Sequence, residues 1–390
     1  MKKKICVVTG SRAEYWLLKP LMEELKRDKS IAPQTLVTGT HLSSDFGLTY
    51  KNIEKDGFYI NKKIDIKLDS DTSVGIAKSM GLALEEFAKA YDKLWPDIVV
   101  LLGDRFEIFA AASAAHISRI PIAHINGGEV TEGAFDDAFR HSITKMSSLH
   151  FTSANEYRKR VIQLGERPST VFNVGAIASD SIRKTKCLAR KELERELNFK
   201  FNKQNILITF HPVTLEHNTS EIQFKNLLNA IDKLKDTHFI FTKANADTGG
   251  KAINRMIDEY VSKNYFRARA FASLGHVKYF SLIKVVDVVL GNSSSGVIEA
   301  PIFKTITVNV GDRQKGRLKT KSIIDCKPVK SSIQKALRIA FSKKFKTAVK
   351  NASNPYYKNN VSANIIKIMK EFPSGGNILK KQFFDIRHKF

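Results

Sequence analysis

Hydrophobic residues in this chain fall into short runs that alternate with amphipathic stretches. Apolar runs such as residues 5–9 and 98–102 are typical of buried strands, and each ends abruptly at glycine or polar residues. The stretches between them, such as residues 16–26 and 74–94, space their apolar positions as a helix does. Strands that alternate with helices predict an α/β fold with a parallel sheet.

The alternation runs through two halves of the chain. In the first half it predicts strands at residues 5–9, 35–38, 98–102, 120–125, 149–152 and 170–174, and helices at 16–26, 74–94 and 156–164. After a charged stretch with a helix at 189–197, it predicts strands at 205–210, 238–242, 285–290 and 305–310, and helices at 222–234, 252–261 and 361–372. Two such Rossmann-like parallel-sheet domains, with a cleft between their strand ends, make the GT-B architecture.

The length of the chain also favours two domains, because 390 residues exceed what one ordinary core holds. We expect one Rossmann-like domain at residues 1–175 and a second at 203–355. A C-terminal helix and basic tail at 356–390 is expected to pack back on the first domain. A single long doubly wound domain is the alternative, and the restart of the pattern in mid-chain counts against it.

The composition of the chain gives it a strong positive charge. The 64 lysine and arginine residues outnumber the 39 acidic residues, which gives a net charge of +25. An anionic partner such as nucleic acid is one interpretation, but lysines on a solvated surface explain most of the charge more simply. The basic tail lacks the interleaved basic and aromatic residues of a nucleic-acid module, so we expect no specific nucleic-acid binding.

Membrane and metal sites find little support in the sequence. No stretch of about 20 apolar residues occurs, so we expect no membrane span. Cys6, Cys187 and Cys326 lie far apart and form no CxxC motif, which argues against a disulfide framework or a zinc site and favours a reducing cytoplasm. No HExxH motif or cluster of cysteine and histidine occurs either.

Polar residues follow two neighbouring strands of the first half. They are Asp104, Arg105, Glu129, Asp136 and Asp137. Because ligands sit at the carboxyl ends of parallel strands, we expect these side chains to share one crevice. Carboxylates that lie close raise one another's pKa, so one can hold a proton while another acts as a base. Such a group could cleave a glycosidic bond, abstract a carbon-bound proton or hold magnesium; solvated loop carboxylates are the plain alternative.

The second half carries a candidate diphosphate cradle. The sequence GNSSSG, which contains Ser293, Ser294, Ser295 and Gly296, lies between a predicted strand and a helix. Serine hydroxyls and the free N–H groups of a helix N-terminus suit a diphosphate, and an ordinary N-cap cluster is the alternative. Glu299, within the helix, could accept the two hydroxyls of a ribose or be a solvated glutamate.

Other strand ends supply candidates for contacts with a bound anion. Arg12 and Arg313 could each clamp a phosphate bidentately, although a lone arginine is more often a surface residue. His211, which ends a strand, could act as acid, base or phosphate contact, or simply hold the turn. His41 and His141 are weaker candidates of the same kind.

A set of motifs occurs in order along the chain. They read TGSRAEYW, TGTHLSSDFG, LLGDRFEIFA, HINGGEVTEGAFDDAFRHSITKM, FHPVTLE, NADTGG, GNSSSGVIEAP and GDRQKGR. Together they resemble the UDP-N-acetylglucosamine 2-epimerase superfamily, and within it the bacterial hydrolysing NeuC-type enzymes that open sialic acid synthesis. The resemblance covers nearly the whole chain and implies a GT-B fold without a metal or redox cofactor.

The resemblance implies the conversion of UDP-N-acetylglucosamine and water to N-acetylmannosamine and UDP. In the family the C2 proton is lost and UDP is eliminated anti, which gives a 2-acetamidoglucal, and water then adds syn with inversion at C2. Such a reaction needs a base, an acid and a cradle for the departing UDP. The family also implies a homodimer or homotetramer.

The resemblance assigns roles residue by residue. Asp104 is the first choice for a catalytic carboxylate, and Asp136, with Asp137, matches the acidic pair of the family. His211 matches a histidine expected near the diphosphate. Positions that match cleft or UDP-contacting residues are Arg12, His41, Arg105, Asn245, Asp247, Ser293, Ser294, Glu299 and Arg313.

One position departs from the pattern of the family. Many relatives carry a glutamate two residues after the histidine of the HINGGE motif, where this chain has Asn126. Because asparagine cannot exchange a proton, either Glu129 takes over that role or Asp104 and Asp136 suffice.

The substrate stays open between several nucleotide sugars. The same subtype includes relatives that act on UDP-2,4-diacetamido-trideoxy sugars (diacetylbacillosamine) for legionaminic acid, and GDP-linked versions. The C-terminal stretches GDRQKGR and SNPYYKNN favour UDP-N-acetylglucosamine. A GT-B glycosyltransferase, which would need an acceptor sugar, is the more distant alternative.

Overall fold

The chain forms two compact units, each built on one parallel sheet. The computed structural model describes residues 2–70, 72–132, 135–213, 219–244, 249–373 and 379–386. The first unit comprises Met1–Glu129, Asp136–Ser181 and Tyr356–Phe390, and the second comprises Val130–Phe135 and Ile182–Pro355. Strands pair in parallel in both sheets, so the predicted α/β class is confirmed.

The sheet of the first unit has seven strands in the order β3-β2-β1-β4-β5-β6-β7. Their bounds are β1 Lys3–Thr9, β2 Ile31–Thr38, β3 Lys62–Ile64, β4 Ile98–Leu102, β5 Ile122–Ile125, β6 Leu149–Thr152 and β7 Val171–Asn173. The strand order reverses between β1 and β4. In open α/β sheets the ligand binds at the carboxyl ends of the strands where this reversal occurs.

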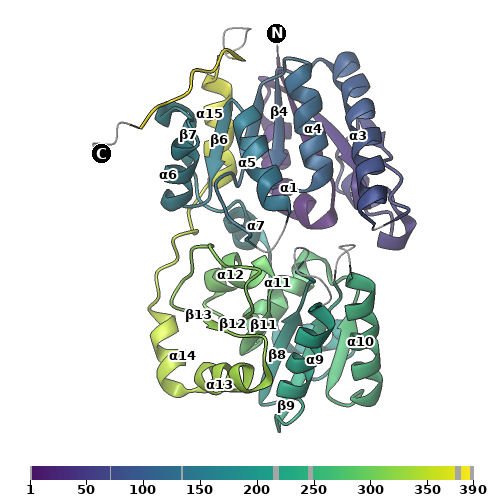
Figure 1. Ribbon diagram of the computed structural model, residues 1–390, viewed down its shortest axis with the longest axis vertical. Coiled ribbons are helices and arrows are strands. Elements are labelled where there is room, and N and C mark those ends of the chain that lie inside the picture. Colours follow the sequence, from purple (N-terminus) through teal and green to yellow (C-terminus); the bar gives the residue numbers. More distant parts are fainter. Residues whose placement is uncertain are drawn as a thin grey trace. The chain divides into compact units, whose positions relative to one another are not determined.

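Helices cover this sheet, most of them through one apolar face, whereas α4 (Phe106–Ile117) is apolar and buried on nearly all sides. They are α1 Arg12–Arg27, α2 Tyr50–Lys55, α3 Ser73–Leu94, α4 Phe106–Ile117, α5 Asp136–Met146, α6 Asn155–Gln163 and α15 Val361–Glu371, and α7 Ala178–Lys184 leads into the second unit. The C-terminal α15, drawn in yellow, packs against α1 (Figure 1). Its buried residues Val361, Ile365 and Met369 join the same core as Leu18 and Leu21 of α1.

The sheet of the second unit has six strands in the order β10-β9-β8-β11-β12-β13. The bounds are β8 Gln204–Thr209, β9 Thr237–Thr242, β10 Ala268–Phe271, β11 Val288–Gly291, β12 Ile306–Val310 and β13 Ile323–Cys326. The helices are α8 Arg190–Leu197, α9 Ser220–Ile231, α10 Gly250–Lys263, α11 Gly275–Val285, α12 Ser294–Ile298, α13 Lys330–Phe341 and α14 Lys343–Lys350 (Figure 1). Here the strand order reverses between β8 and β11.

Several element bounds differ from the predicted ones. Helix α1 begins at Arg12, four residues before the predicted start at residue 16, because the Ser11 side chain caps it by accepting from the N–H of Glu14. Strand β11 begins at Val288 and not at residue 285, because α11 continues to Val285. The pattern missed the edge strands β3, β10 and β13, whose partly exposed residues form no continuous apolar run. Among the described helices, none has the length and apolarity that a membrane crossing requires.

Candidate active site

Asp104 lies at the end of β4, where the first sheet reverses its strand order. The chain leaves β4 through Gly103, whose φ of +80° suits glycine and whose N–H donates to the carbonyl of Ile125 over 3.1 Å. The Asp104 side chain, 20% exposed, forms an ion pair with Arg140 of α5. A carboxylate of the predicted set is therefore held in place and still open to solvent on one side.

Arg140 connects two of the predicted carboxylates. One of its terminal nitrogens pairs with Asp104, and the other lies 3.6 Å from Oε2 of Glu129. The arginine side chain is almost fully buried, so it fixes both carboxylates and offsets part of their charge. Arg140 was not among the predicted site residues, although its position three and four residues after the acidic pair puts it on the same side of a helix.

Glu129 is buried and engaged by neighbouring side chains. Its Oε1 accepts from the hydroxyl of Ser153 over 2.7 Å, and its other oxygen faces Arg140. This environment suits a residue that orients Arg140 better than one that exchanges protons with a ligand. The two ways in which the chain was expected to manage without a glutamate at position 126, through Glu129 or through Asp104 and Asp136, both stay predictions.

Asn126 follows β5 with a φ of +67°, in the left-handed region that asparagine tolerates better than most residues. Its N–H donates to the carbonyl of Phe151 over 2.9 Å. Its Oδ1 is buried and has no hydrogen-bond partner in the described part of the chain. A buried acceptor of this kind is available to an N–H group of a ligand.

Asp136 and Asp137 open α5, where negative charge is favoured by the helix dipole. Both side chains are half-buried, and Oδ2 of Asp137 lies 3.6 Å from Nε2 of His141 one turn later. Because α5 also carries Arg140, one helix brings together the acidic pair and the partner of Asp104. The predicted grouping of these carboxylates therefore has a physical basis in this helix.

Two carboxyl groups that the sequence analysis missed lie nearby. Glu14 of α1 accepts from the N–H of Gly10 over 2.7 Å, and the fully buried Glu107 of α4 accepts from Nε of Arg105 over 2.7 Å. Burial, together with repulsion from Glu107, raises the pKa of Glu14 to about 7. Arg105 is therefore engaged by a protein carboxylate. A lone glutamate in the apolar stretch FEIFAAASAA was the available signal for Glu107.

The predicted contacts Arg12 and His41 differ in their environments. Arg12 begins α1 and is half-buried, and its side chain makes no hydrogen bond or ion pair with the other described residues, so it suits an anion at a helix N-terminus. His41 is fully buried, with Nε2 3.0 Å from Oγ1 of Thr9 and Nδ1 2.8 Å from Oγ1 of Thr49. Burial lowers the pKa of His41 to about 3, which favours a structural role.

In the second unit, the ends of β8 and β11 meet around Asn292. The N–H of His211 donates to Oδ1 of Asn292 over 2.7 Å, and Nδ2 of Asn292 donates back to the carbonyl of His211 over 2.7 Å. The carbonyl of Asn292 accepts from Arg313 over 3.2 Å and from Gln314 over 2.9 Å. Two predicted site residues thus meet at an asparagine that the sequence analysis did not single out.

Two glycines allow the backbone to pack closely here. Gly291 has a φ of +136°, and a Cβ on it would lie 1.9 Å from the carbonyl oxygen of Thr209, so only glycine fits between β11 and β8. A Cβ on Gly296 would lie 2.9 Å from Cγ2 of Thr307, whose hydroxyl donates to the Gly296 carbonyl over 2.7 Å. The structure therefore explains Gly296, predicted as a substrate contact, by the close packing of α12 on β12.

The serines at the start of α12 have different neighbours. Ser293 caps the helix by accepting from the N–H of Ser295. The Ser295 hydroxyl donates to Glu299 over 2.5 Å and accepts from the hydroxyl of Tyr279 over 2.7 Å. Burial raises the pKa of Glu299. Ser293 and Ser294 are half-buried at the start of the helix, whereas Ser295 is engaged by its neighbours.

The remaining predicted contacts follow β9. This strand ends at Thr242, and Asn245 and Asp247, which come after it, lie outside the described residues.

Comparison with known proteins identifies the family. The chain matches the family model of UDP-N-acetylglucosamine 2-epimerase over residues 23–370. It is 46% identical to GDP/UDP-N,N'-diacetylbacillosamine 2-epimerase (hydrolyzing) of Campylobacter jejuni, covering 99% of this chain and 100% of the relative. It is 41% identical to polysialic acid biosynthesis protein P7 of Escherichia coli, covering 98% of both chains. It is 35% identical to UDP-N,N'-diacetylbacillosamine 2-epimerase (hydrolyzing) of Legionella pneumophila, covering 98% of this chain and 99% of the relative.

A solved structure shares the fold. The crystal structure of UDP-GlcNAc 2-epimerase from Neisseria meningitidis bound to UDP-GlcNAc matches with a TM-score of 0.82 and 16% identity, covering 95% of this chain and 100% of that one. Likeness at this identity shows the fold, and it confirms the predicted GT-B-like architecture. With the family model and the full-length relatives, it follows that the chain belongs to the UDP-N-acetylglucosamine 2-epimerase family, in its hydrolysing 2-epimerase branch.

Proposed function

We propose that this enzyme is a hydrolysing 2-epimerase whose substrate is nucleotide-linked N,N'-diacetylbacillosamine, a 2,4-diacetamido-trideoxy sugar. Its products are the C2-epimerised sugar and the free nucleoside diphosphate. The observation that carries this choice is the 46% identity, over the full length, to the relative named for that activity. A second relative with the same activity in its name supports it at 35% identity. The comparisons therefore favour the alternative substrate over UDP-N-acetylglucosamine, which the C-terminal motifs had favoured.

UDP-N-acetylglucosamine is the second candidate, with N-acetylmannosamine as the product. Its support is the relative named for polysialic acid biosynthesis, which is 41% identical over nearly the whole chain. Both candidates have an acetamido group at C2, and the same chemistry at C2 serves both. They differ at C4, where the diacetamido sugar carries a second amide in place of a hydroxyl, and at the further position where the trideoxy sugar lacks a hydroxyl.

In the proposed reaction, Asp104 removes the C2 proton while the nucleotide leaves from C1. The neighbouring Arg140 holds this carboxylate in place through an ion pair, and a carboxylate oxygen is the group that accepts the proton. Water then adds to the double bond, and we assign protonation at C2 to the acidic pair at the start of α5, with Asp136 as the first choice. These groups come from one cluster, in which Glu129 holds Arg140.

We assign the nucleotide to the strand ends of the second unit. Arg313 lies against the carbonyl of Asn292, and Ser293 and Ser294 begin α12, so donors converge where that sheet reverses its strand order. Arg12, which has no ionic partner in the described chain, is proposed as a further contact to the anion. Such donors would stabilise the charge on the departing diphosphate.

The test of the substrate is a comparison of kcat/KM for UDP-linked and GDP-linked diacetylbacillosamine and for UDP-N-acetylglucosamine. We expect a diacetamido substrate to be preferred over UDP-N-acetylglucosamine by at least about 100-fold, because a site built for the second amide leaves polar groups unpaired without it. A preference for UDP-N-acetylglucosamine would instead support the second candidate. Turnover only in the presence of an acceptor sugar would point to a glycosyltransferase and contradict both.

A further inference from the structure

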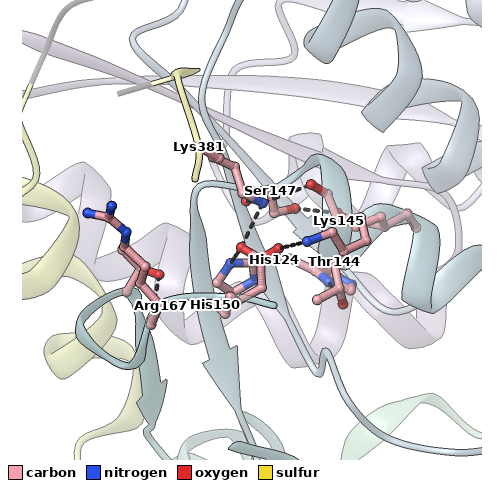
Figure 2. A network of polar contacts seen from close by, with 10 residues as sticks. His124, Thr144, Lys145, Ser147, His150, Arg167 and Lys381 are labelled. Carbon is pink, nitrogen blue, oxygen red and sulfur yellow. Dashed lines mark hydrogen bonds and ion pairs between the residues drawn. The ribbon is translucent and has the colours of Figure 1, made fainter. Parts of the chain in front are cut away.

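The C-terminal tail places a lysine at the edge of a polar network whose centre, Glu166, is buried in the first unit. Lys381, on the described segment 379–386, reaches the carboxylate of Glu166 over 2.7 Å. Its ammonium also donates to the carbonyl oxygens of Lys145 over 2.8 Å and Ser147 over 2.7 Å. Figure 2 shows the Lys381 side chain meeting this group of residues. An ammonium has three N–H donors, so these three acceptors use its full capacity.

Neighbouring tail residues hold Lys381 in place. The N–H of Phe384 donates to the carbonyl of Gly165 over 2.9 Å. The ring of Phe383 covers Gly165 so closely that a Cβ on this glycine would lie 2.3 Å from a ring carbon. The same ring lies 5.0 Å from the ammonium of Lys145, a cation–π contact. The tail is thus docked by several contacts and not by a single flexible lysine.

Glu166 is the buried centre of the network. Its Oε1 accepts from Lys145 over 2.6 Å, and its Oε2 accepts from Nε2 of His150 over 3.0 Å and from Lys381. Burial alone would raise the pKa of Glu166, but the hydrogen bond from His150 and the two lysines lower it to about 2. His150 is fully buried, and burial lowers its pKa, so the neutral ring donates through Nε2. A buried carboxylate with these partners is well compensated.

The network binds the C-terminal end of α5 through hydrogen bonds. The carbonyl groups of Lys145 and Ser147, which Lys381 binds, belong to the last turn of this helix and the residues that follow it. A cation at a helix C-terminus also interacts favourably with the helix dipole. The other end of the same helix carries Asp136 and Asp137, the proposed acids.

A second connection runs from α5 to the turn that bears Asp104. Nε2 of His124 donates to the carbonyl of Gly103 over 2.8 Å, and Nδ1 lies 3.1 Å from the hydroxyl of Thr144 on α5 (Figure 2). Burial lowers the pKa of His124 to about 3, so the ring is neutral and Thr144 donates to Nδ1. His124 and His150 are register partners on β5 and β6. Buried hydrogen bonds therefore join α5, the sheet and the residue before Asp104.

We propose that Lys381 is a positioning residue for the epimerase reaction, because it fastens the C-terminal end of α5 to the buried Glu166–His150 pair and so holds the acids at the other end of the helix. The inference rests on the proposed function. In the part of the chain that the structure describes, the Lys381 ammonium contacts Glu166, Lys145 and Ser147 and none of the proposed reacting groups, so its effect passes through the placement of α5. Small displacements of a catalytic group are enough to slow a reaction strongly.

The test compares Lys381→Met with Lys380→Met in the full-length enzyme. Both remove one lysine charge from adjacent exposed positions of the tail, but the side chain of Lys380 makes no hydrogen bond or ion pair with other described residues. We expect Lys381→Met to lower kcat about tenfold, with KM within about twofold of wild type, and Lys380→Met to change neither. Lys381→Arg, which keeps the cation, is expected to recover most of the lost kcat.

Hydrogen exchange of the α5 amides gives a readout that does not depend on turnover. In Lys381→Met, the amides of residues 136–147 are expected to exchange about tenfold faster than in wild type and in Lys380→Met, because the end of the helix is released. Wild-type kcat in Lys381→Met overturns the positioning role, as does a loss of kcat with unchanged exchange in α5. If the wild-type enzyme turns over none of the three nucleotide sugars, the proposed function fails and the positioning role fails with it.

Discussion

Arg140 of α5 forms an ion pair with Asp104 at the end of β4, although the two residues lie far apart in the chain. The pair joins the helix that carries the acidic pair to the strand end where the first sheet reverses its order. Since the same arginine lies 3.6 Å from Glu129, it holds two carboxylates that differ in exposure. Asp104, which is partly exposed, is the proposed base, and the buried Glu129 is proposed to orient the arginine that holds it.

Asp104→Asn should abolish most of the turnover and leave nucleotide binding intact. Asparagine keeps the shape of the side chain but cannot accept the C2 proton, so we expect kcat to fall by about 100-fold or more. UDP affinity, measured by calorimetry, should stay within about twofold of wild type, because the nucleotide is assigned to the second unit. Asp92→Asn, at an exposed position on α3, is the control. Wild-type kcat in Asp104→Asn would rule out the proposed base.

Glu129→Gln should be much milder than Asp104→Asn. Glutamine can still accept from Ser153 over the observed 2.7 Å contact, but it loses the charge that faces Arg140. We expect kcat to fall about tenfold while C2 deuterium exchange persists. A loss as large as that of Asp104→Asn, with no exchange at C2, would mean that Glu129 transfers a proton and replaces the glutamate missing at position 126.

Asn126→Gly should affect one substrate class more than the other. Glycine accepts the φ of +67° without strain and removes only the buried Oδ1, which has no partner in the described residues. If this oxygen accepts from the second amide of the diacetamido sugar, kcat/KM for that substrate falls about tenfold, and kcat/KM for UDP-N-acetylglucosamine changes less than about twofold. Equal losses for both substrates would contradict this contact.

Stability should decrease as the pH falls below about 6.5, the pKa of an unperturbed histidine. Burial lowers the pKa of His41 and of His124 to about 3, so between these values the unfolded chain binds protons that the folded chain does not. Each histidine then costs about 2 kcal/mol of folding stability at pH 5. The pKa of Glu14 is raised to about 7, so below pH 7 the folded chain binds a proton that the unfolded chain binds only at lower pH. This proton stabilises the folded chain as the pH falls and offsets part of the loss.

Urea unfolding at pH 7.5 and pH 5 measures this dependence. His124→Gln should reduce the difference between the two pH values, whereas the exposed His116→Gln should leave it unchanged. An unchanged pH dependence in His124→Gln would show that this histidine is not held neutral in the folded enzyme.

The hydrophobic pattern predicted the elements whose strands are buried on both faces, such as β4 and β8, because such strands read as continuous apolar runs. The edge strand β13 was missed because its partly exposed residues interrupt that signal. Asp104 could be grouped with the acidic pair because both follow neighbouring strands. Contacts such as Lys381–Glu166 could not be predicted, since the partners come from distant segments and only the folded chain brings them together.

The most direct test of the central claim is the reaction of the wild-type enzyme with UDP-linked diacetylbacillosamine in deuterated water, followed by NMR. The hydrolysing 2-epimerase mechanism predicts free UDP and a sugar that is inverted at C2 and carries one deuterium at that carbon. Release of UDP with retained configuration and no deuterium at C2 would show simple hydrolysis and contradict the proposed mechanism.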